Sequence, residues 1–409
     1  MEVKNLNLRI IYPLAFIGDL TLSMLLVLSI LYGTNAGLST IEVGLIGGAY
    51  GFAYIFMSAI LGRISDIISR KISLMIAISV QTILTLLFML IITQAVEFVF
   101  FGLFLVQLLY GIAYGFFWPS IEAYVSENTE YSSIAHQKGI GNFCISWSIG
   151  FALGPFFAGM FYDFDIIIAL VLIFICYASI FFLILFKMPK AKPRNKNLNK
   201  NVVKESLKLN KLSNQKTINS NSKKILVLLL MGVTIYATIS KMLLSYFTNY
   251  AALPEGLNWT GTLIGLVMFF FGLGRTFYFI FARYLKNSFS ALSQSFVLIA
   301  LCLIVLAFLY PPTLIAIILF ITGFFVGRTY LVSLELLLKY EQEKKGTKAG
   351  IFESMVGIGS ALSPFFAGMI ATINLKMPFF IFAAIVFIFV IIHIFLKKSI
   401  QFEDYKNDY

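Results

Sequence analysis

Charged side chains inside long apolar stretches are the residues of this sequence that could do chemistry. Asp19, Lys241, Arg275, Arg328 and Glu353 each lie in such a stretch. A charge near the centre of a membrane helix costs about 2.5–3.5 kcal/mol, so each one needs a charged partner or a wet cavity. We expect Asp19 and Lys241 to line a cavity that binds a solute or a coupling ion. For the other three, snorkelling or an internal ion pair explains the charge as well as contact with a solute does.

Lys241 belongs to a polar stripe on one predicted helix. The stripe steps by four, three, four and three residues, through Thr234, Thr238, Lys241, Ser245 and Thr248. That spacing places all five side chains on one helical face. A polar face on a membrane helix should meet protein or water, which favours a cavity role for Lys241 over a purely structural ion pair.

A second helical face combines aromatic and polar side chains. Gln107, Gly111, Tyr114 and Trp118 follow one another at steps of four, three and four. Aromatic rings with one polar tip suit a pocket for an organic solute, and they pack equally well inside any helix bundle. We keep Gln107, Tyr114 and Trp118 as candidate cavity residues on this basis.

Arrangements typical of enzymes and metal centres are missing from the sequence. The two histidines, His136 and His393, are far apart in sequence, and Cys144, Cys176 and Cys302 are spread through apolar stretches. Neither pattern resembles a metal cluster, a disulfide framework or a nucleophile with its base. No GxxxxGK[ST] phosphate loop is present either, which argues against ATP as the energy source. We therefore expect no enzymatic activity, no metal and no cofactor.

The elements that must position these residues are membrane helices. Of the 409 residues, 59% are hydrophobic and 12% are charged, and the mean hydropathy is +0.90. Soluble domains carry about a quarter charged residues. Stretches of about twenty apolar residues predict twelve transmembrane helices, at 10–33, 41–61, 72–93, 98–120, 139–161, 166–187, 225–250, 260–282, 290–310, 313–336, 349–371 and 378–396. The fold class is therefore an all-α membrane protein.

One long hydrophilic segment, 189–224, divides the chain into two sets of six helices. It is rich in Lys, Asn and Ser, which predicts a flexible linker. The domains expected are residues 1–188, a basic linker 189–224 and residues 225–409. Because the N-terminal apolar span has no small-residue cleavage site after it, we interpret it as a retained helix.

The two halves repeat each other in sequence. Residues 149–160 read IGFALGPFFAGM and residues 358–369 read IGSALSPFFAGM, with ten of twelve positions identical. GFF at 115–117 and GFF at 323–325 match at nearly the same offset. Parallel repeats of six helices predict a pseudo-two-fold axis along the membrane normal and a solute site near the midplane between the halves.

Basic residues predict the orientation. With the N-terminus inside, 27 of the 31 Lys and Arg residues fall on the inner side, and Lys376 alone falls outside. This asymmetry predicts cytoplasmic termini and a cytoplasmic linker, in the plasma membrane. The formal net charge of +12 is explained in this way and not by nucleic acid as a partner.

The segment GRISDIISRK at 62–71 carries a family signature. A Gly, an acid four residues later and a basic pair, here Gly62, Asp66, Arg70 and Lys71, resemble the loop between helices 2 and 3 of the major facilitator superfamily. The resemblance implies a twelve-helix fold of two six-helix bundles, with this loop acting as a latch on the cytoplasmic side. Counting from the shared GFF places Glu127 and Glu335 at equivalent helix ends, so we expect paired latches in the two halves. Their members are Arg70 with Glu127, or alternatively with Glu122, in the first half, and Arg283 with Glu335 in the second.

Helix 5 resembles the drug-exporting antiporter branch of that superfamily. Gly150, Gly154, Pro155 and Gly159 are spaced G-x-x-x-G-P-x-x-x-G, a pattern of close helix packing around a bend. The second copy keeps Pro364 and Gly368. Helix 4 departs from the branch, because QLLYG at 107–111 places Gln107 where an Arg is usual. If protons drive transport, we expect Asp19 to carry them, since Gln107 cannot titrate.

The resemblance implies a secondary transporter that works by alternating access. The leading hypothesis is an exporter of amphipathic or drug-like compounds. The alternative is uptake or exchange of an organic anion or sugar-type solute, because Lys241, Arg275 and Arg328 outnumber Asp19. The expected partners are a small-molecule solute, the lipid bilayer and, optionally, a co-transported proton or other ion. We expect the chain to function as a monomer.

Overall fold

The computed structural model describes residues 8–93, 96–129, 133–188, 215–285, 288–340 and 345–398. Within these ranges all regular secondary structure is helical, and twelve segments are long and apolar enough to cross a membrane, which confirms the predicted number. The first six are α1 (Leu8–Asn35), α2 (Thr40–Ile68), α3 (Arg70–Ile91), α4 (Val96–Thr129), α5 (Ser133–Phe164) and α6 (Ile166–Lys187). The next six begin with a composite span and continue with α10 (Gly261–Phe281), α11 (Phe289–Leu306), α12 (Pro312–Tyr340), α13 (Lys345–Ala371) and α14 (Met377–Lys398).

The composite span contains a change of helix type. It consists of α8 (Gln215–Met242), a π-helical segment η2 (Leu243–Phe247) and a short α9 (Thr248–Ala252). The π segment begins two residues after Lys241 and all five of its residues are buried. A π turn inside an α-helix changes the direction of the side chains that follow it. The predicted single polar face from Thr234 to Thr248 is therefore interrupted in the middle.

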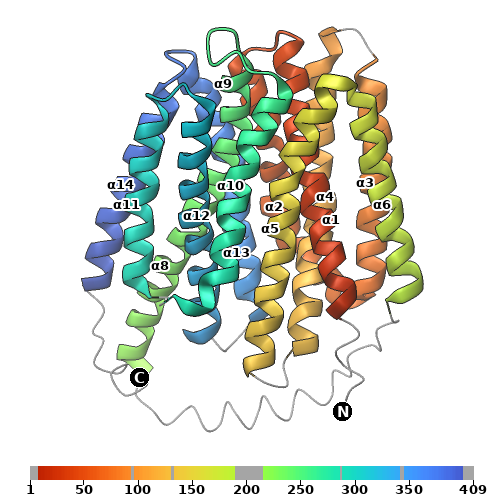
Figure 1. The fold of residues 1–409 in the computed structure, drawn as a ribbon. Coiled ribbons are helices and arrows are strands. Elements are labelled where there is room, and N and C mark those ends of the chain that lie inside the picture. Colours follow the sequence, from red (N-terminus) through yellow and green to blue (C-terminus); the bar gives the residue numbers. More distant parts are fainter. Residues whose placement is uncertain are drawn as a thin grey trace.

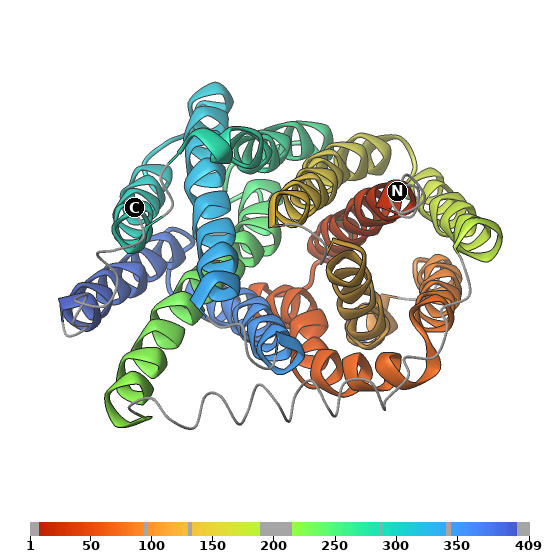
Figure 2. The same ribbon diagram turned by 90° about the horizontal axis from the view of Figure 1, so that it is seen from below.

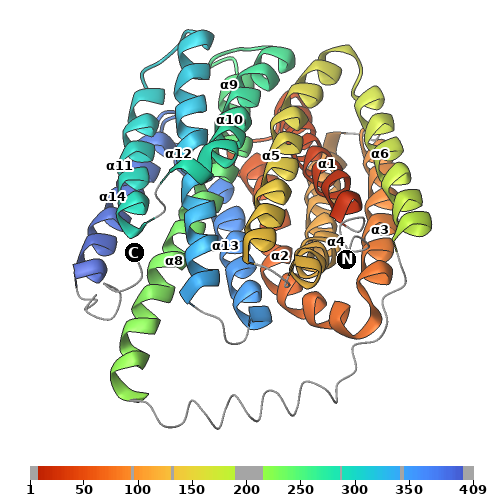
Figure 3. The same ribbon diagram turned by 60° about the horizontal axis from the view of Figure 1, so that its bottom comes forward.

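Several helices are longer than hydropathy predicted. α4 continues to Thr129, and α8 begins at Gln215, inside the segment predicted to be a flexible linker. Figure 3 shows α8 continuing past its neighbours at the end of the bundle where the chain begins. Hydropathy detects only the part of a helix that lies in hydrocarbon, while Gln, Lys and Glu continue a helix readily in water. The linker prediction is thus wrong for 215–224, and 189–214 lies outside the described residues.

The helices form two groups, α1–α6 and α8–α14, which we call the first and second halves (Figure 1). The end of the bundle where α1 begins and α14 ends is here called the terminal end, and the opposite one the distal end. Figure 2, a view onto the terminal end, shows the halves meeting at two places, with α2 beside α13 and α5 beside α10. These two pairs are called the α2–α13 seam and the α5–α10 seam.

Small residues bring the helix backbones into contact along both seams. A Cβ atom on Gly44 would lie 2.6 Å from the carbonyl oxygen of Pro364, and Gly48 is in similar contact with Ala361. At the other seam Gly159 meets Gly261, and Gly265 meets Pro155. Contacts this close leave no room for a side chain. Because α1 and α5 end, and α2 and α10 begin, at the distal end, the two halves are closed against each other there.

The residues of the helix 5 motif pack against both halves. Gly150 and Gly154 face α1, where a Cβ would collide with Phe16 and Ser23, whereas Pro155 and Gly159 face α10 in the other half. In the second copy of the repeat, Pro364 and Gly368 face α2. The repeat therefore supplies one small-residue surface to each seam.

Candidate functional site

A cavity lies between the two halves. It extends from the middle of the bundle toward the terminal end. Its volume is about 80 Å³, which is room for several water molecules, since one needs roughly 10–15 Å³ by the same measure. The first half supplies Asp19, Leu22, Tyr50, Tyr54, Trp118, Glu122, Phe143, Trp147 and Phe151, and the second supplies Tyr236, Ala237, Ser240, Lys241, Tyr330, Glu353, Val356 and Ser360.

Aromatic rings form most of the wall. Tyr50 and Tyr54, one turn apart on α2, stack with their centroids 5.4 Å apart. Across the gap between the halves, Trp147 meets Tyr330 edge to face at 5.2 Å, and Tyr330 lies 4.7 Å from Tyr236. Such rings offer flat apolar surface with hydroxyl or indole groups at the edge. The wall is suited to an organic solute with some polar substituents.

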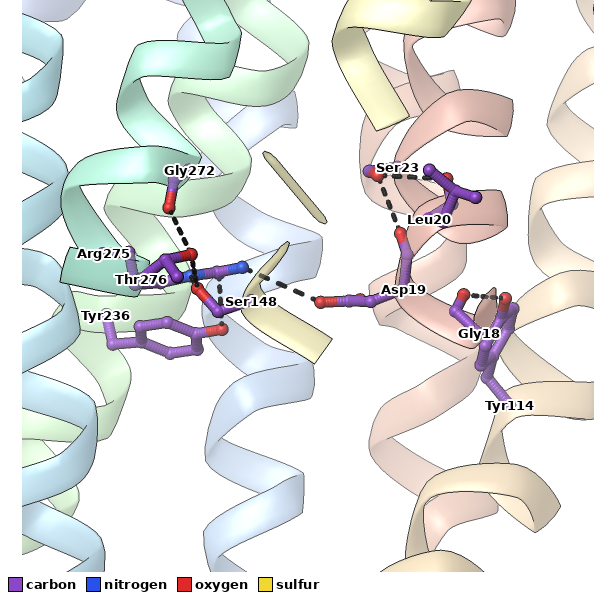
Figure 4. A network of polar contacts seen from close by, with 10 residues as sticks. All are labelled: Gly18, Asp19, Leu20, Ser23, Tyr114, Ser148, Tyr236, Gly272, Arg275 and Thr276. Carbon is purple, nitrogen blue, oxygen red and sulfur yellow. Dashed lines mark hydrogen bonds and ion pairs between the residues drawn. The ribbon is translucent and has the colours of Figure 1, made fainter. Parts of the chain in front are cut away.

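A buried ion pair crosses the halves beside the cavity. Arg275 on α10 is fully buried, and its Nη2 atom lies 3.8 Å from Asp19 Oδ2 on α1 (Figure 4). This distance allows an ion pair but not a hydrogen bond. Nε donates a hydrogen bond to Ser148 Oγ at 3.0 Å, and Nη1 donates one to the Tyr236 hydroxyl at 3.2 Å. Of the explanations open for Arg275, the internal ion pair is the one that the structure contains.

The guanidinium of Arg275 is also sandwiched by aromatic rings. It lies 4.4 Å from the centroid of Trp147 and 4.0 Å from that of Phe151. Arg stacks on ring faces in this way more readily than Lys, because the guanidinium is planar and weakly hydrated. The ion pair with Asp19 is thus held in place from several sides.

Lys241 lies in the same cavity, where it is attracted by Asp19 without forming an ion pair with it in the described part of the chain. It is 9% exposed, and its Nζ atom lies 4.9 Å from the centroid of Tyr50. Among the described residues, the structure contains no hydrogen bond or ion pair of this ammonium group. A cation–π contact compensates a buried ammonium only in part. Lys241 therefore offers its charge to whatever occupies the cavity.

Two carboxyl groups face each other at the terminal side of the cavity. Glu122 on α4 and Glu353 on α13 are within hydrogen-bonding reach of one another. The Tyr54 hydroxyl donates a hydrogen bond of 2.6 Å to Glu353 Oε2. We had expected Glu122 as an alternative latch partner at a helix end. It lies in the cavity wall instead, because α4 continues beyond it to Thr129.

These features resemble those of known transporters, and a match to a family model identifies the family. The model described as Major Facilitator Superfamily matches residues 11–339. The chain belongs to this superfamily. It is accordingly a membrane transporter and not an enzyme.

Sequence relatives of this superfamily member are distant. Multidrug resistance protein 1 of Bacillus subtilis (strain 168) is 27% identical over 159 residues, 39% of this chain and 39% of the relative. An uncharacterized MFS-type transporter of Methanocaldococcus jannaschii is 24% identical over 157 residues, 38% of this chain and 39% of the relative. The matches span about two fifths of the length of these proteins.

Solved structures of transporters share the fold along almost the whole chain. A mutant of the nucleoside transporter NupG superposes with a TM-score of 0.70 at 18% identity, covering 96% of this chain and 99% of the other. The human organic anion transporter MFSD10 (TETRAN) superposes with a TM-score of 0.68 at 14% identity, covering 96% of this chain and 100% of the other. At such identities the likeness establishes the fold and leaves the solute open.

Two of the three candidates on α4 lie away from the cavity of this superfamily member. Gln107 donates a hydrogen bond of 2.8 Å to Ser29, and the Tyr114 hydroxyl donates one of 2.7 Å to the Gly18 carbonyl oxygen, both inside the first half. Of these three candidates, only Trp118 lines the cavity. Gln107 and Tyr114 bond to α1 and Gly111 packs on the Tyr50 backbone of α2, so these members lie inside the first half and only Trp118 reaches the cavity.

The signature loop makes contacts inside the first half. Arg70 donates a hydrogen bond of 2.6 Å to Ser65, and Gly62 packs on Pro119. Lys71 Nζ donates to the carbonyl oxygens of Leu185 and Met188, at 2.7 and 2.8 Å, which caps the C-terminal end of α6.

The other members of the expected latches are described less completely. The side chains of Asp66, Glu127 and Arg283 lie outside the described residues. Glu335 is half-buried near the terminal end of α12 and has interactions there. Arg328 is half-buried, next to Tyr278, and does not line the cavity. The paired latches remain a prediction.

Proposed function

We propose that the chain is a secondary active transporter that exports amphipathic or drug-like organic compounds by alternating access. The observation that carries this proposal is the aromatic cavity shared by both halves. The helix 5 motif and the likeness to Multidrug resistance protein 1 support the exporter branch. The two bodies that rock are residues 1–188 and 225–409, joined by 189–224, in a monomer.

The terminal end is the cytoplasmic one in this proposal. The support is the concentration of Lys and Arg in the segments at that end. With the halves closed against each other at the distal end, the cavity would receive its solute from the cytoplasm. A solute larger than the present cavity enters only as the halves separate at the terminal end.

Uptake or exchange of an organic anion is the second candidate. An ammonium group without a carboxylate partner favours an anionic substituent on the solute. NupG and the human organic anion transporter have the same fold, which is compatible with this candidate without favouring it.

Transport by the purified full chain in liposomes tests both candidates. A lipophilic cationic dye, an organic anion and a nucleoside are offered with and without an imposed proton or sodium gradient. Export of the dye driven by a gradient supports the first candidate, and movement of the anion supports the second. Tyr236→Ala should abolish either movement, whereas Phe186→Leu on the exposed face of α6 should not. Failure to move any probe, in protein that remains folded, would contradict the proposed function.

A further inference from the structure

The carboxyl pair Glu122–Glu353 joins the two halves. Glu122 comes from α4 and Glu353 from α13, and both side chains line the central cavity. Glu353 is 6% exposed, and its partner on α2 is the buried Tyr54 hydroxyl. Two carboxylates in contact inside a protein cannot both carry a negative charge. A proton must therefore be present between them for the pair to be in contact.

Among the described side chains around the pair, none is a basic group that would replace this proton. No ion pair to either carboxyl occurs within the described part of the chain. Of the described residues, the titratable groups that face the pair are hydroxyls and a thiol: Tyr50 and Tyr54 on α2, Cys144 on α5, Tyr236 on α8 and Tyr330 on α12. Lys241 and Asp19 lie farther along the same cavity.

Water has a place in the same cavity as the pair. Ser240 and Ser360 are 3% and 1% exposed, both line the cavity, and neither hydroxyl has a hydrogen-bond partner. Buried polar groups without a partner in a cavity of this size are the usual positions of bound water. Such water can accept a proton from the pair and pass it along the cavity.

We propose that Glu122 and Glu353 form the proton-coupling site of this transporter, a carboxyl pair that binds one proton when the halves meet and releases it when they separate. This deepens the proposed function, on which it rests, and it moves the coupling role from Asp19, which Arg275 already neutralises. In the step itself, the O–H bond of the protonated carboxyl breaks and its proton goes to cavity water. The proton returns by the reverse transfer when α4 and α13 come together again.

The direction of coupling follows from the charges. Contact between the carboxyl groups requires the proton, so acid favours the state in which α4 and α13 are close. Loss of the proton leaves two negative charges that repel each other in a poorly solvated cavity. Alkaline conditions therefore favour separation of the halves at the terminal end.

Infrared spectroscopy of the full chain in lipid tests the proton site without any solute. Acidification should produce the carbonyl stretch of a protonated carboxylic acid, which shifts in heavy water. The double variant Glu122→Gln/Glu353→Gln should lose this band, and the matched variant Asp19→Asn should keep it. A band that persists in the double variant, or that disappears in Asp19→Asn, overturns the proposal.

Distance measurements test the coupling to motion. Spin labels are placed at Phe186→Cys on α6 and Phe395→Cys on α14, exposed positions near the terminal end, in protein whose three cysteines are replaced. The label distance should increase as the pH rises, and the increase should be lost in the double Gln variant, whose amides can pair without a proton. A distance that is independent of pH in the unaltered pair overturns the proposal. Because no solute is present, the result is independent of whether the transport assay identifies one.

Discussion

The cavity contains two acidic sites whose buried negative charge is neutralised in different ways. Asp19 is neutralised by a cation, Arg275, which is held by Ser148, Tyr236 and two aromatic rings. Glu122 and Glu353 have no cation beside them in the described residues, and only a shared proton can neutralise the pair. Both sites join the first half to the second. A carboxyl group therefore makes a permanent contact where its partner is a cation and a switchable one where its partner is another carboxyl group.

The largest effect is expected for removal of the cation from the first site. Arg275→Met leaves Asp19 as an unpaired buried charge, and loss of one member of a buried pair costs about 3–5 kcal/mol. We expect a large fall in the thermal unfolding midpoint of the purified protein. Asp19→Asn/Arg275→Gln should recover most of the loss, because no charge is left unpaired. A midpoint unchanged in Arg275→Met would show that this pair is not the permanent contact.

Removal of the unpaired cation in the same cavity should affect binding more than stability. Lys241→Met abolishes a charged hydrogen bond to an anionic solute, worth about 1.5–3 kcal/mol, which corresponds to about 10–100-fold in affinity. Its unfolding midpoint should fall much less than that of Arg275→Met, because Asp19 keeps its ion pair with Arg275. Lys241→Arg is the matched variant and should retain anion binding. Equal affinity for anions in Lys241→Met would exclude this role.

A smaller effect is expected for the hydroxyl that orients the second site. Tyr54→Phe removes the 2.6 Å hydrogen bond to Glu353 and keeps the ring stacked on Tyr50. Loss of such a bond costs about 1–3 kcal/mol, because the acceptor remains buried. We expect a modest fall in the unfolding midpoint, which is measured beside Tyr110→Phe. Tyr110 donates to a backbone carbonyl oxygen inside the first half, so its loss should not change the response of the label distance to pH. An identical pH response in Tyr54→Phe and the unaltered protein would separate Tyr54 from the switch.

The smallest effect is expected at the distal end, where a third acid crosses the halves. Asp163 on α5 accepts hydrogen bonds from the backbone amides of Gly261 and Thr262, at 2.9 and 2.7 Å, at the start of α10. Asp165 does the same for Ile167 within its own half, at 2.8 Å. Loss of a capping side chain costs about 0.5–2 kcal/mol.

The two variants Asp163→Ala and Asp165→Ala should therefore destabilise the protein similarly. Only Asp163→Ala should increase the labelling of a cysteine placed near the start of α10, at the half-buried position Leu263→Cys on an otherwise cysteine-free chain, because of these two acids only Asp163 bonds to the other half. Equal labelling in the two variants would restrict Asp163 to a local capping role.

Much of the fold could be predicted from the sequence because the bilayer dictates it. Hydrocarbon about 30 Å thick requires a helix of about twenty apolar residues, so composition alone reveals the twelve spans. The repeat at 149–160 and 358–369 indicated equivalent helices, and Gly159 and Gly368 do lie at the two seams. The end of α4 and the start of α8 were missed because hydropathy does not detect the part of a helix that lies outside the hydrocarbon.

The candidate site was only partly predictable, for a reason of packing. A helical period shows which side chains share a face but not what that face meets. Hydrogen bonds to α1 hold Gln107 and Tyr114 within the first half, and no feature of their own spacing shows it. Glu122 was expected only as an alternative latch partner for Arg70, because its position in the sequence does not show that it lines the cavity. The contact between Glu122 and Glu353 depends on how the two halves are placed relative to each other, and the sequence pattern of one half does not show this.

The glycine contacts of the α2–α13 seam have a kinetic consequence. Between Gly44 and Pro364, and between Gly48 and Ala361, the two backbones touch through atoms that have no directional bonds to break. Dispersion attraction amounts to about 0.1–0.2 kcal/mol per atom pair and declines gradually with distance. Two helix surfaces in such contact can tilt relative to each other without crossing a high energy barrier. The rate of exchange between states should therefore depend on the charged groups of the cavity and on the hydrogen bonds Thr40–Gly368 and Tyr54–Glu353, and much less on the glycine contacts of this seam.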